Sequence, residues 1–136
     1  GVRDFMDRTR QQARDAGYVE TVFGRRLALD YIHSRNAAQR AGAERAAINA
    51  PIQRSAADIL RRAMVRMDEA LDKAGLSARM LLQVHDELIF ETTDAEVDAT
   101  VEVVRRVMEK APEPAVRLTV PLQVDARAAQ NWEEAH

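Results

Sequence analysis

The tripeptide His85-Asp86-Glu87 is the part of this chain whose residue types and spacing could do chemistry. Apolar residues with high β propensity lie on both sides of it, at 80–82 and 88–90. This pattern predicts a β-hairpin over residues 79–92 with His85 and Asp86 in its turn. Two adjacent acids beside buried strands resist ionisation unless a cation lies nearby. Because Mg²⁺ prefers carboxylate oxygens, the turn is either a magnesium site or a solvated loop.

The three residues of this turn have different expected roles. Successive side chains of a strand point to opposite faces, so Asp86 and Glu87 should not both bind one ion directly. Asp86, nearer the tip, is the expected direct ligand, and Glu87 would act through a water molecule. His85 by itself is typical of an ordinary turn histidine. A zinc site is disfavoured, because the chain has no cysteine and neither His33 nor His136 has ligand spacing.

A second set of candidates lies on a long helical pattern. Arg45, Asn49 and Gln53 are four residues apart, so they should share one helix face. They are either a solvated polar stripe or donors to acceptors of the DNA minor groove, N3 of purines and O2 of pyrimidines. Arg25 and Arg26 belong to an earlier predicted hairpin and are either phosphate contacts or solvated residues.

The elements that must position these residues indicate an α+β fold. It consists of a small antiparallel sheet with helices packed on one face, joined to a helical arm with a short N-terminal hairpin. Pro51 should kink or break the long helix of that arm. The expected elements are a helix over 2–16 ended by Gly17, a hairpin over 18–29, a helix over 37–74, the hairpin 79–92, a helix over 95–110 and a strand over 116–124.

Composition restricts the class of protein. With 136 residues, 46% of them hydrophobic, the chain can form one domain with a modest core. The absence of cysteine excludes disulfides and thiolate metal sites. No apolar run approaches the roughly 20 residues of a membrane span, and no signal peptide is evident. We therefore expect a cytoplasmic protein without membrane contact.

The small net charge of −2 conceals an asymmetry. Residues 1–75 hold 14 Lys and Arg against 10 acids, whereas residues 76–136 hold 6 against 12. Between Arg35 and Arg66 there are seven arginines and only two acids. This distribution suits a protein that contacts phosphates with one part and binds cations with the other.

Four blocks of the sequence resemble motifs of bacterial family A DNA polymerases, in the same order and spacing. They are Gly17–Arg26, similar to "GYVETxxGRR"; Glu44–Ile59, similar to "ERxAxNxPxQGTAAD"; Gln83–Leu88, similar to the third palm motif; and Asn131–His136, similar to the "NWxxAH" terminus. The resemblance covers essentially the whole chain. Two positions depart from it, because Arg54 stands where the family normally has Gly and Asp30 stands where it usually has Pro.

The resemblance implies a DNA-directed DNA polymerase, a nucleotidyltransferase of replication and repair. It implies that Asp86 is one of two aspartates that hold a pair of Mg²⁺ ions in a two-metal displacement, with a lesser part for Glu87. His85 would contact the primer-terminal sugar or phosphate. Arg45, Asn49 and Gln53 would lie against the primer–template. The implied partners are primer–template DNA and deoxynucleoside triphosphates, and the implied enzyme is a monomer associated with the bacterial nucleoid.

The same resemblance places residues 1–136 in the C-terminal palm with part of the fingers. Residues 1–36 would form a helix and hairpin, 37–75 the long helix, and 76–136 the palm sheet and helix. The second aspartate and the nucleotide-binding helix would precede residue 1, so we expect half a catalytic site and an inactive isolated chain. The alternative is a non-catalytic nucleic-acid-binding domain. A phosphohydrolase would need Glu91 and Asp125 as further ligands, and their spacing does not support it.

Overall fold

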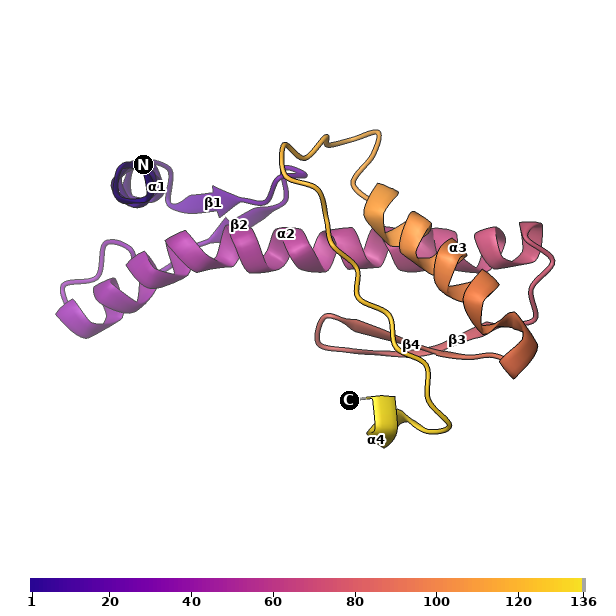
Figure 1. The fold of residues 1–136 in the computed structure, drawn as a ribbon. Coiled ribbons are helices and arrows are strands. Elements are labelled where there is room, and N and C mark those ends of the chain that lie inside the picture. Colours follow the sequence, from indigo (N-terminus) through magenta and orange to yellow (C-terminus); the bar gives the residue numbers. More distant parts are fainter. Residues whose placement is uncertain (136) are drawn as a thin grey trace. The chain divides into compact units, whose positions relative to one another are not determined.

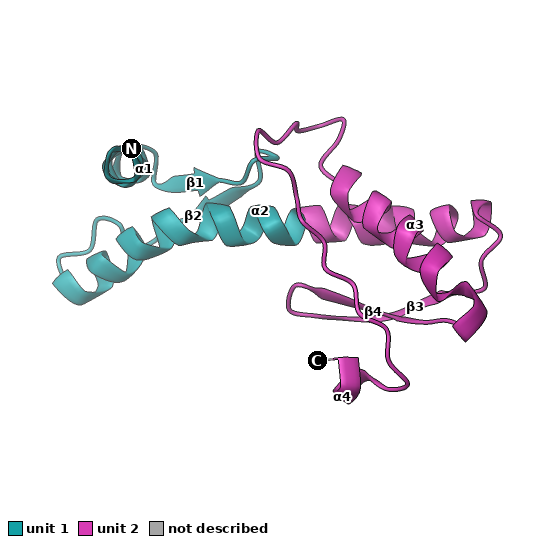
Figure 2. Cartoon of the chain, viewed as in Figure 1, with its two compact units in different colours: residues 1–58 teal, residues 59–136 magenta. Residues whose placement is uncertain are grey.

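The computed structural model describes residues 1–135, which form two compact units, residues 1–58 and residues 59 onward (Figure 2). The helix α2 contributes its first part to unit 1 and its second part to unit 2. Nine elements follow one another along the described chain (Figure 1): α1 (Val2–Ala16), β1 (Tyr18–Glu20), β2 (Arg26–Ala28), α2 (Ala37–Lys73), β3 (Arg79–Val84), β4 (Glu87–Glu91), the 3₁₀ turn η1 (Asp94–Glu96), α3 (Val97–Lys110) and α4 (Trp132–Ala135). The predicted mixed fold with small antiparallel sheets is confirmed. His136, the last residue of the fourth sequence block, lies outside the described residues.

Unit 1 joins α1 and the first hairpin to the beginning of α2. Gly17 ends α1 as expected, because its φ of 75° is readily adopted only by glycine and lets its N–H donate to the carbonyl of Ala13. The hairpin pairs β1 with β2 in antiparallel register, with Val19 opposite Leu27. Its core residues come from all three elements and from the connector before α2, and are Ala13, Val19, Leu29, Ile32 and Ala47.

The helix α2 has recognisable signals at both ends. Asn36 caps its first turn, because its side-chain oxygen accepts hydrogen bonds from the N–H groups of Ala38 and Gln39 at 2.9 and 3.3 Å. After its last residue, Gly75 adopts a φ of 68°. Pro51 lies inside the helix, which continues through it without interruption. The break that a proline can cause is therefore absent.

Unit 2 packs the hairpin β3–β4 and the helix α3 on the second part of α2. Its core contains buried residues of both helices and of the segment before β3, namely Met67, Leu71, Ala78, Val103 and Val104. Met80, Leu88 and Phe90 of the hairpin pack against this cluster from the sheet. The helices therefore cover one face of the hairpin, as the apolar pattern predicted.

A bulge interrupts the alternation of β3. Met80 pairs with Phe90 and Leu82 pairs with Ile89, so Leu81 is an extra residue in its strand. Leu81 and Leu82 are consequently both exposed, by 54% and 45%. The sequence alone did not reveal this irregularity.

The predicted strand over residues 116–124 is wrong. This segment is irregular, and the two described sheets contain only β1 with β2 and β3 with β4. A strand requires a neighbour for its backbone hydrogen bonds, and none of the described strands pairs with it. Pro121 also removes one backbone donor. The segment is held instead through single contacts, such as the bond from Arg105 Nε to the carbonyl of Val124 at 3.3 Å.

Candidate functional site

The turn between β3 and β4 brings His85, Asp86 and Glu87 together at the surface. Val84 pairs with Glu87, so the connection consists of His85 and Asp86 alone. His85 has a φ of 54°, in the left-handed region that only a minority of non-glycine residues adopt. The side-chain amide of Gln83 donates to the carbonyl of His85 at 3.2 Å. The side chains of all three turn residues are exposed, and Asp86 lies at the tip as predicted.

The acidic residues of this turn fit part of a magnesium site. Asp86 and Glu87 are exposed acids, and carboxylate oxygens are the donor type that Mg²⁺ prefers. Among residues 1–135, however, no group of three or more His, Cys, Asp and Glu side chains could hold a metal ion. Glu91, at the far end of β4 opposite Arg79, is separated from the turn by the length of the strand. The turn thus supplies ligands but does not form a complete metal site.

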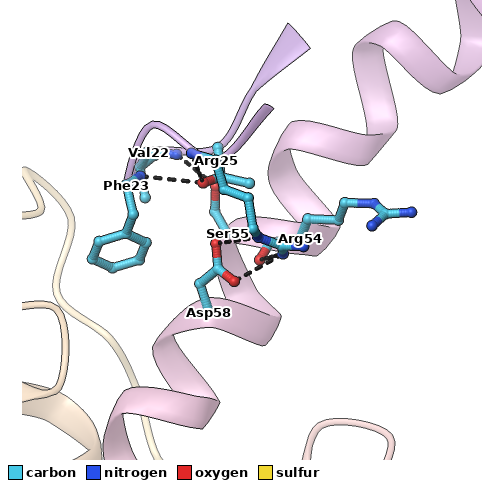
Figure 3. Close-up of polar contacts among 7 residues, drawn as sticks. Val22, Phe23, Arg25, Arg54, Ser55 and Asp58 are labelled. Atoms are coloured by element: carbon cyan, nitrogen blue, oxygen red, sulfur yellow. Dashed lines mark hydrogen bonds and ion pairs between the residues drawn. The ribbon is translucent and has the colours of Figure 1, made fainter. Parts of the chain in front are cut away.

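The polar stripe of α2 is presented on a continuous helix. Arg45, Asn49 and Gln53 are all exposed, and the uninterrupted course of the helix through Pro51 keeps them on one face. Within the described part of the chain, none of these three side chains has a hydrogen-bond or ion-pair partner. Their donors are therefore available to a ligand. Arg54 is also exposed, and Figure 3 shows its side chain extending away from Asp58.

The two hairpin arginines already have partners in unit 1. Arg25 contacts Asp58 through one edge of its guanidinium, at 2.8 Å from Nη2 to Oδ1 and 3.3 Å from Nε to Oδ2 (Figure 3). Arg26 pairs with Glu20 at 3.0 Å and lies over the ring of Tyr18, 4.5 Å from its centre. The sequence left open whether these arginines contact phosphates or are simply solvated. Because both have partners in unit 1, neither is simply solvated.

Two buried hydroxyl groups, which no sequence pattern indicated, shape the tip of the first hairpin. Ser55 of α2 is 7% exposed, and its Oγ accepts the N–H of Val22 at 2.9 Å (Figure 3). Thr21 is 6% exposed, and its Oγ1 accepts the N–H groups of Phe23 and Arg25 at 3.3 and 3.2 Å. Val22 and Ser55 are 33 positions apart in the sequence, so no local pattern could have indicated this contact.

An ion pair also fixes α1 to α2. Arg14 Nη2 lies 2.5 Å from Glu44 Oε1. The hydrogen bond from Arg14, together with the positive charge of the neighbouring arginines, lowers the pKa of Glu44 below its ordinary value. Glu44 is thus an anion in the helix turn just before Arg45, and its charge is balanced within unit 1.

None of the helices formed by residues 1–135 is long and apolar enough to cross a membrane.

Comparison with known proteins identifies the family. The model of "DNA polymerase family A" matches residues 1–134. DNA polymerase I of Rhizobium leguminosarum is 57% identical over 138 residues, and that of Pseudomonas aeruginosa is 52% identical over 136 residues. Each alignment covers 100% of this chain, which spans 14% of the relative's length.

A solved structure agrees in fold. The polymerase domain of Pol1 from M. smegmatis, in complex with DNA primer–template and dNTP, superposes with a TM-score of 0.89 at 46% identity. The match covers 98% of this chain and 23% of that one. Since both the family model and the close relatives extend over nearly the whole sequence, the chain belongs to DNA polymerase family A.

Proposed function

We propose that this chain acts as the C-terminal palm and part of the fingers of a DNA-directed DNA polymerase. That enzyme, called the complete polymerase below, would carry out template-dependent nucleotidyl transfer in replication and repair. The observation that carries the proposal is the exposed Asp86 at the tip of a hairpin that packs on a helical core. Membership of the family supports it, as does the DNA primer–template and dNTP in the M. smegmatis structure.

Asp86 would be a direct ligand of Mg²⁺ in the complete polymerase, with Glu87 in a water-mediated contact. Bound Mg²⁺ supplies activation of the primer 3′-hydroxyl and stabilisation of the leaving pyrophosphate. Asp86 is exposed, so its carboxylate is accessible to an ion. In this proposal a further carboxylate comes from another part of the complete polymerase, because residues 1–135 contain no group of three candidate ligands.

The DNA contacts would come from α2 and from the turn. Arg45, Asn49 and Gln53 would donate to the minor-groove acceptors that all base pairs share, and so test base-pair shape without reading sequence. Their exposure and their lack of partners among the described residues support this assignment. His85 would contact the primer-terminal sugar or phosphate. Arg25 and Arg26 were also candidates for phosphate contacts, but their partners within unit 1 give them less freedom to reach DNA.

The second candidate function is a non-catalytic nucleic-acid-binding domain. It is left open by Arg54, which stands where the family normally has Gly. Primer extension separates the two. The complete polymerase should lose extension when Asp86 is replaced by Ala, while its affinity for primer–template stays close to that of the wild type. If the Asp86→Ala variant extended primers at the wild-type rate, the catalytic assignment would fail and only the binding function would remain.

The 136-residue chain alone provides the complementary experiment. Because Mg²⁺ gives up its water molecules reluctantly, one or two carboxylates hold it weakly, and the isolated chain should incorporate no nucleotide on a primed template. Steady primer extension by purified, nuclease-free chain would refute the proposal that its metal site is incomplete.

A further inference from the structure

We propose that Arg25 and Asp58 are positioning residues, which fasten the tip of the first hairpin to the turn of α2 that presents Gln53. This inference rests on the proposed function, in which Gln53 contacts DNA. It gives Arg25 a role different from a phosphate contact, and it gives Asp58 a role in DNA binding without contact to DNA.

The ion pair between these residues has the geometry of a strong contact. The guanidinium of Arg25 meets the carboxylate of Asp58 side-on, with distances of 2.8 and 3.3 Å. The Asp58 side chain is only 13% exposed, whereas that of Arg25 is 40% exposed. Removing the arginine would therefore leave a carboxylate that is largely shielded from water without its cation, which is unfavourable.

The pair is the outer part of a larger attachment. Ser55, one turn before Asp58, accepts the backbone N–H of Val22 at 2.9 Å (Figure 3). Arg25 Nη2 also lies 3.5 Å from the carbonyl oxygen of Arg54. The hairpin tip thus contacts α2 at three positions within about one helical turn, Arg54, Ser55 and Asp58. Gln53 is the residue immediately before this turn.

Hydrogen bonds within the hairpin tip hold its backbone in one conformation. Thr21 is buried and accepts two backbone N–H groups of the tip, and its own N–H donates to the carbonyl of Arg25 at 2.9 Å. Gly24 adopts a φ of 80°, which permits the tight return of the chain. The backbone of Arg25 is therefore held by Thr21 independently of the contact between its side chain and Asp58.

The helix needs support at this point because of Pro51. Proline has no backbone N–H, so the helical hydrogen bond to the carbonyl of Ala47 is missing one turn before the attachment. A helix that lacks one bond is easier to bend locally, and bending would move the side chain of Gln53. The attachment at residues 54–58 opposes that motion from the C-terminal side.

Charge gives a way to separate positioning from phosphate binding. Each phosphate contact made by a cationic side chain adds about 0.9 to the slope of log affinity against log salt concentration. A guanidinium held by Asp58 at 2.8 Å adds little to that slope, since the pair has no net charge. Positioning therefore predicts weaker DNA binding with an unchanged salt slope.

The test measures primer–template affinity of the complete polymerase at several salt concentrations. It compares Arg25→Ala, Asp58→Asn and the double variant, with Glu69→Gln as a matched control that removes the acid of an exposed ion pair on the same helix. We expect each single variant to weaken binding about tenfold, the double variant to be no weaker than either, and the salt slope to remain unchanged. The conservative Asp58→Glu should recover most of the affinity, which a loss of folding would not allow.

Three results would overturn the inference, and the third is given by the Gln53 variant below. One is a salt slope lowered by about one for Arg25→Ala while Asp58→Asn binds normally, which identifies a phosphate contact. A second is additive losses in the double variant. Gln53→Ala in the same assay separates this inference from the proposed function. If Gln53→Ala binds DNA normally, the minor-groove assignment fails; if it binds weakly while Asp58→Asn binds normally, only the positioning role fails.

Discussion

Arg14 of α1 and Glu44 of α2 form an ion pair across 30 positions of sequence, with 2.5 Å between Nη2 and Oε1. Arg25 and Asp58 form a second pair of the same kind. Glu44 and Asp58 are the two acids of the arginine-rich stretch 35–66. Each is paired with an arginine that lies before this stretch in the sequence. The stretch therefore keeps a surplus of positive charge, which favours contact with phosphates.

The first prediction concerns the pKa of Glu44. Replacing Arg14 by Ala removes the hydrogen bond that is the main cause of the lowered pKa, so this pKa should rise toward 4.5. A carboxylate with a depressed pKa stabilises the folded state above its unfolded pKa and loses that effect as the pH falls through the folded value. The stability difference between wild type and Arg14→Ala should thus shrink in acid. Site-resolved NMR titration measures the shift.

Lys73→Ala is the control for this titration. The hydrogen bond from Lys73 lowers the pKa of Glu69, at the other end of α2. Its removal should raise the pKa of Glu69 and leave that of Glu44 where it is. An unaltered Glu44 titration in Arg14→Ala would show that the ion pair does not persist in solution.

A second prediction concerns the backbone of His85. Its φ of 54° disfavours any residue with a Cβ, and the cost is about 1 kcal/mol. His85→Gly should therefore be more stable than His85→Ala by roughly this amount, as measured by urea denaturation. Both variants lack the imidazole, so both should bind primer–template more weakly than the wild type, and by the same factor. Equal stability of the two variants would mean that the turn relaxes to another conformation.

A third prediction concerns the core under the second hairpin. Leu71 is 2% exposed, so Leu71→Ala should destabilise unit 2 by about 2–5 kcal/mol. Val65, on the same helix, is 84% exposed, and Val65→Ala should change stability by less than about 0.5 kcal/mol. Hydrogen exchange of the amides of β3, β4 and α3 would report the loss. Full protection in Leu71→Ala would contradict the packing of these elements on α2.

A fourth prediction concerns the polar stripe. Gln53→Ala should weaken binding of the complete polymerase to primer–template by the same factor for every terminal base pair, because the minor-groove acceptors are common to all of them. Gln11→Ala is a matched control, since Gln11 is an exposed glutamine that bonds to Asp15 within α1. Affinity measured on the four possible terminal pairs tests the idea. A loss confined to particular pairs would indicate direct sequence readout instead.

The sequence predicted those features that depend on neighbouring residues. The helix end at Gly17 follows from a local backbone preference, and the turn at His85 and Asp86 follows from the apolar residues on both sides of it; both predictions were correct. The exposure of Arg45, Asn49 and Gln53 on one face followed from helical periodicity. The family followed from motifs that extend over the whole chain, and the relatives confirm it.

What the sequence missed depends on distant partners. Residues 116–124 alternate like a strand, but a strand also requires a neighbour to pair with, and alternation does not reveal whether one exists. The contacts of Arg25 with Asp58 and of Val22 with Ser55 each span 33 positions, beyond any local pattern. The bulge at Leu81 changes which face two leucines occupy, and no turn residue marks it in the sequence.

The most direct test of the proposed metal ligand is the single-turnover rate of nucleotide addition by the complete polymerase with Asp86→Asn. This change removes the negative charge and keeps the size of the side chain. Asp94→Asn is the matched control, since Asp94 is an exposed acid that follows the same hairpin. We predict a rate at least about 1,000-fold lower for Asp86→Asn, with primer–template affinity within about twofold of wild type. A rate within about tenfold of the Asp94→Asn control would contradict the assignment of Asp86 as a metal ligand.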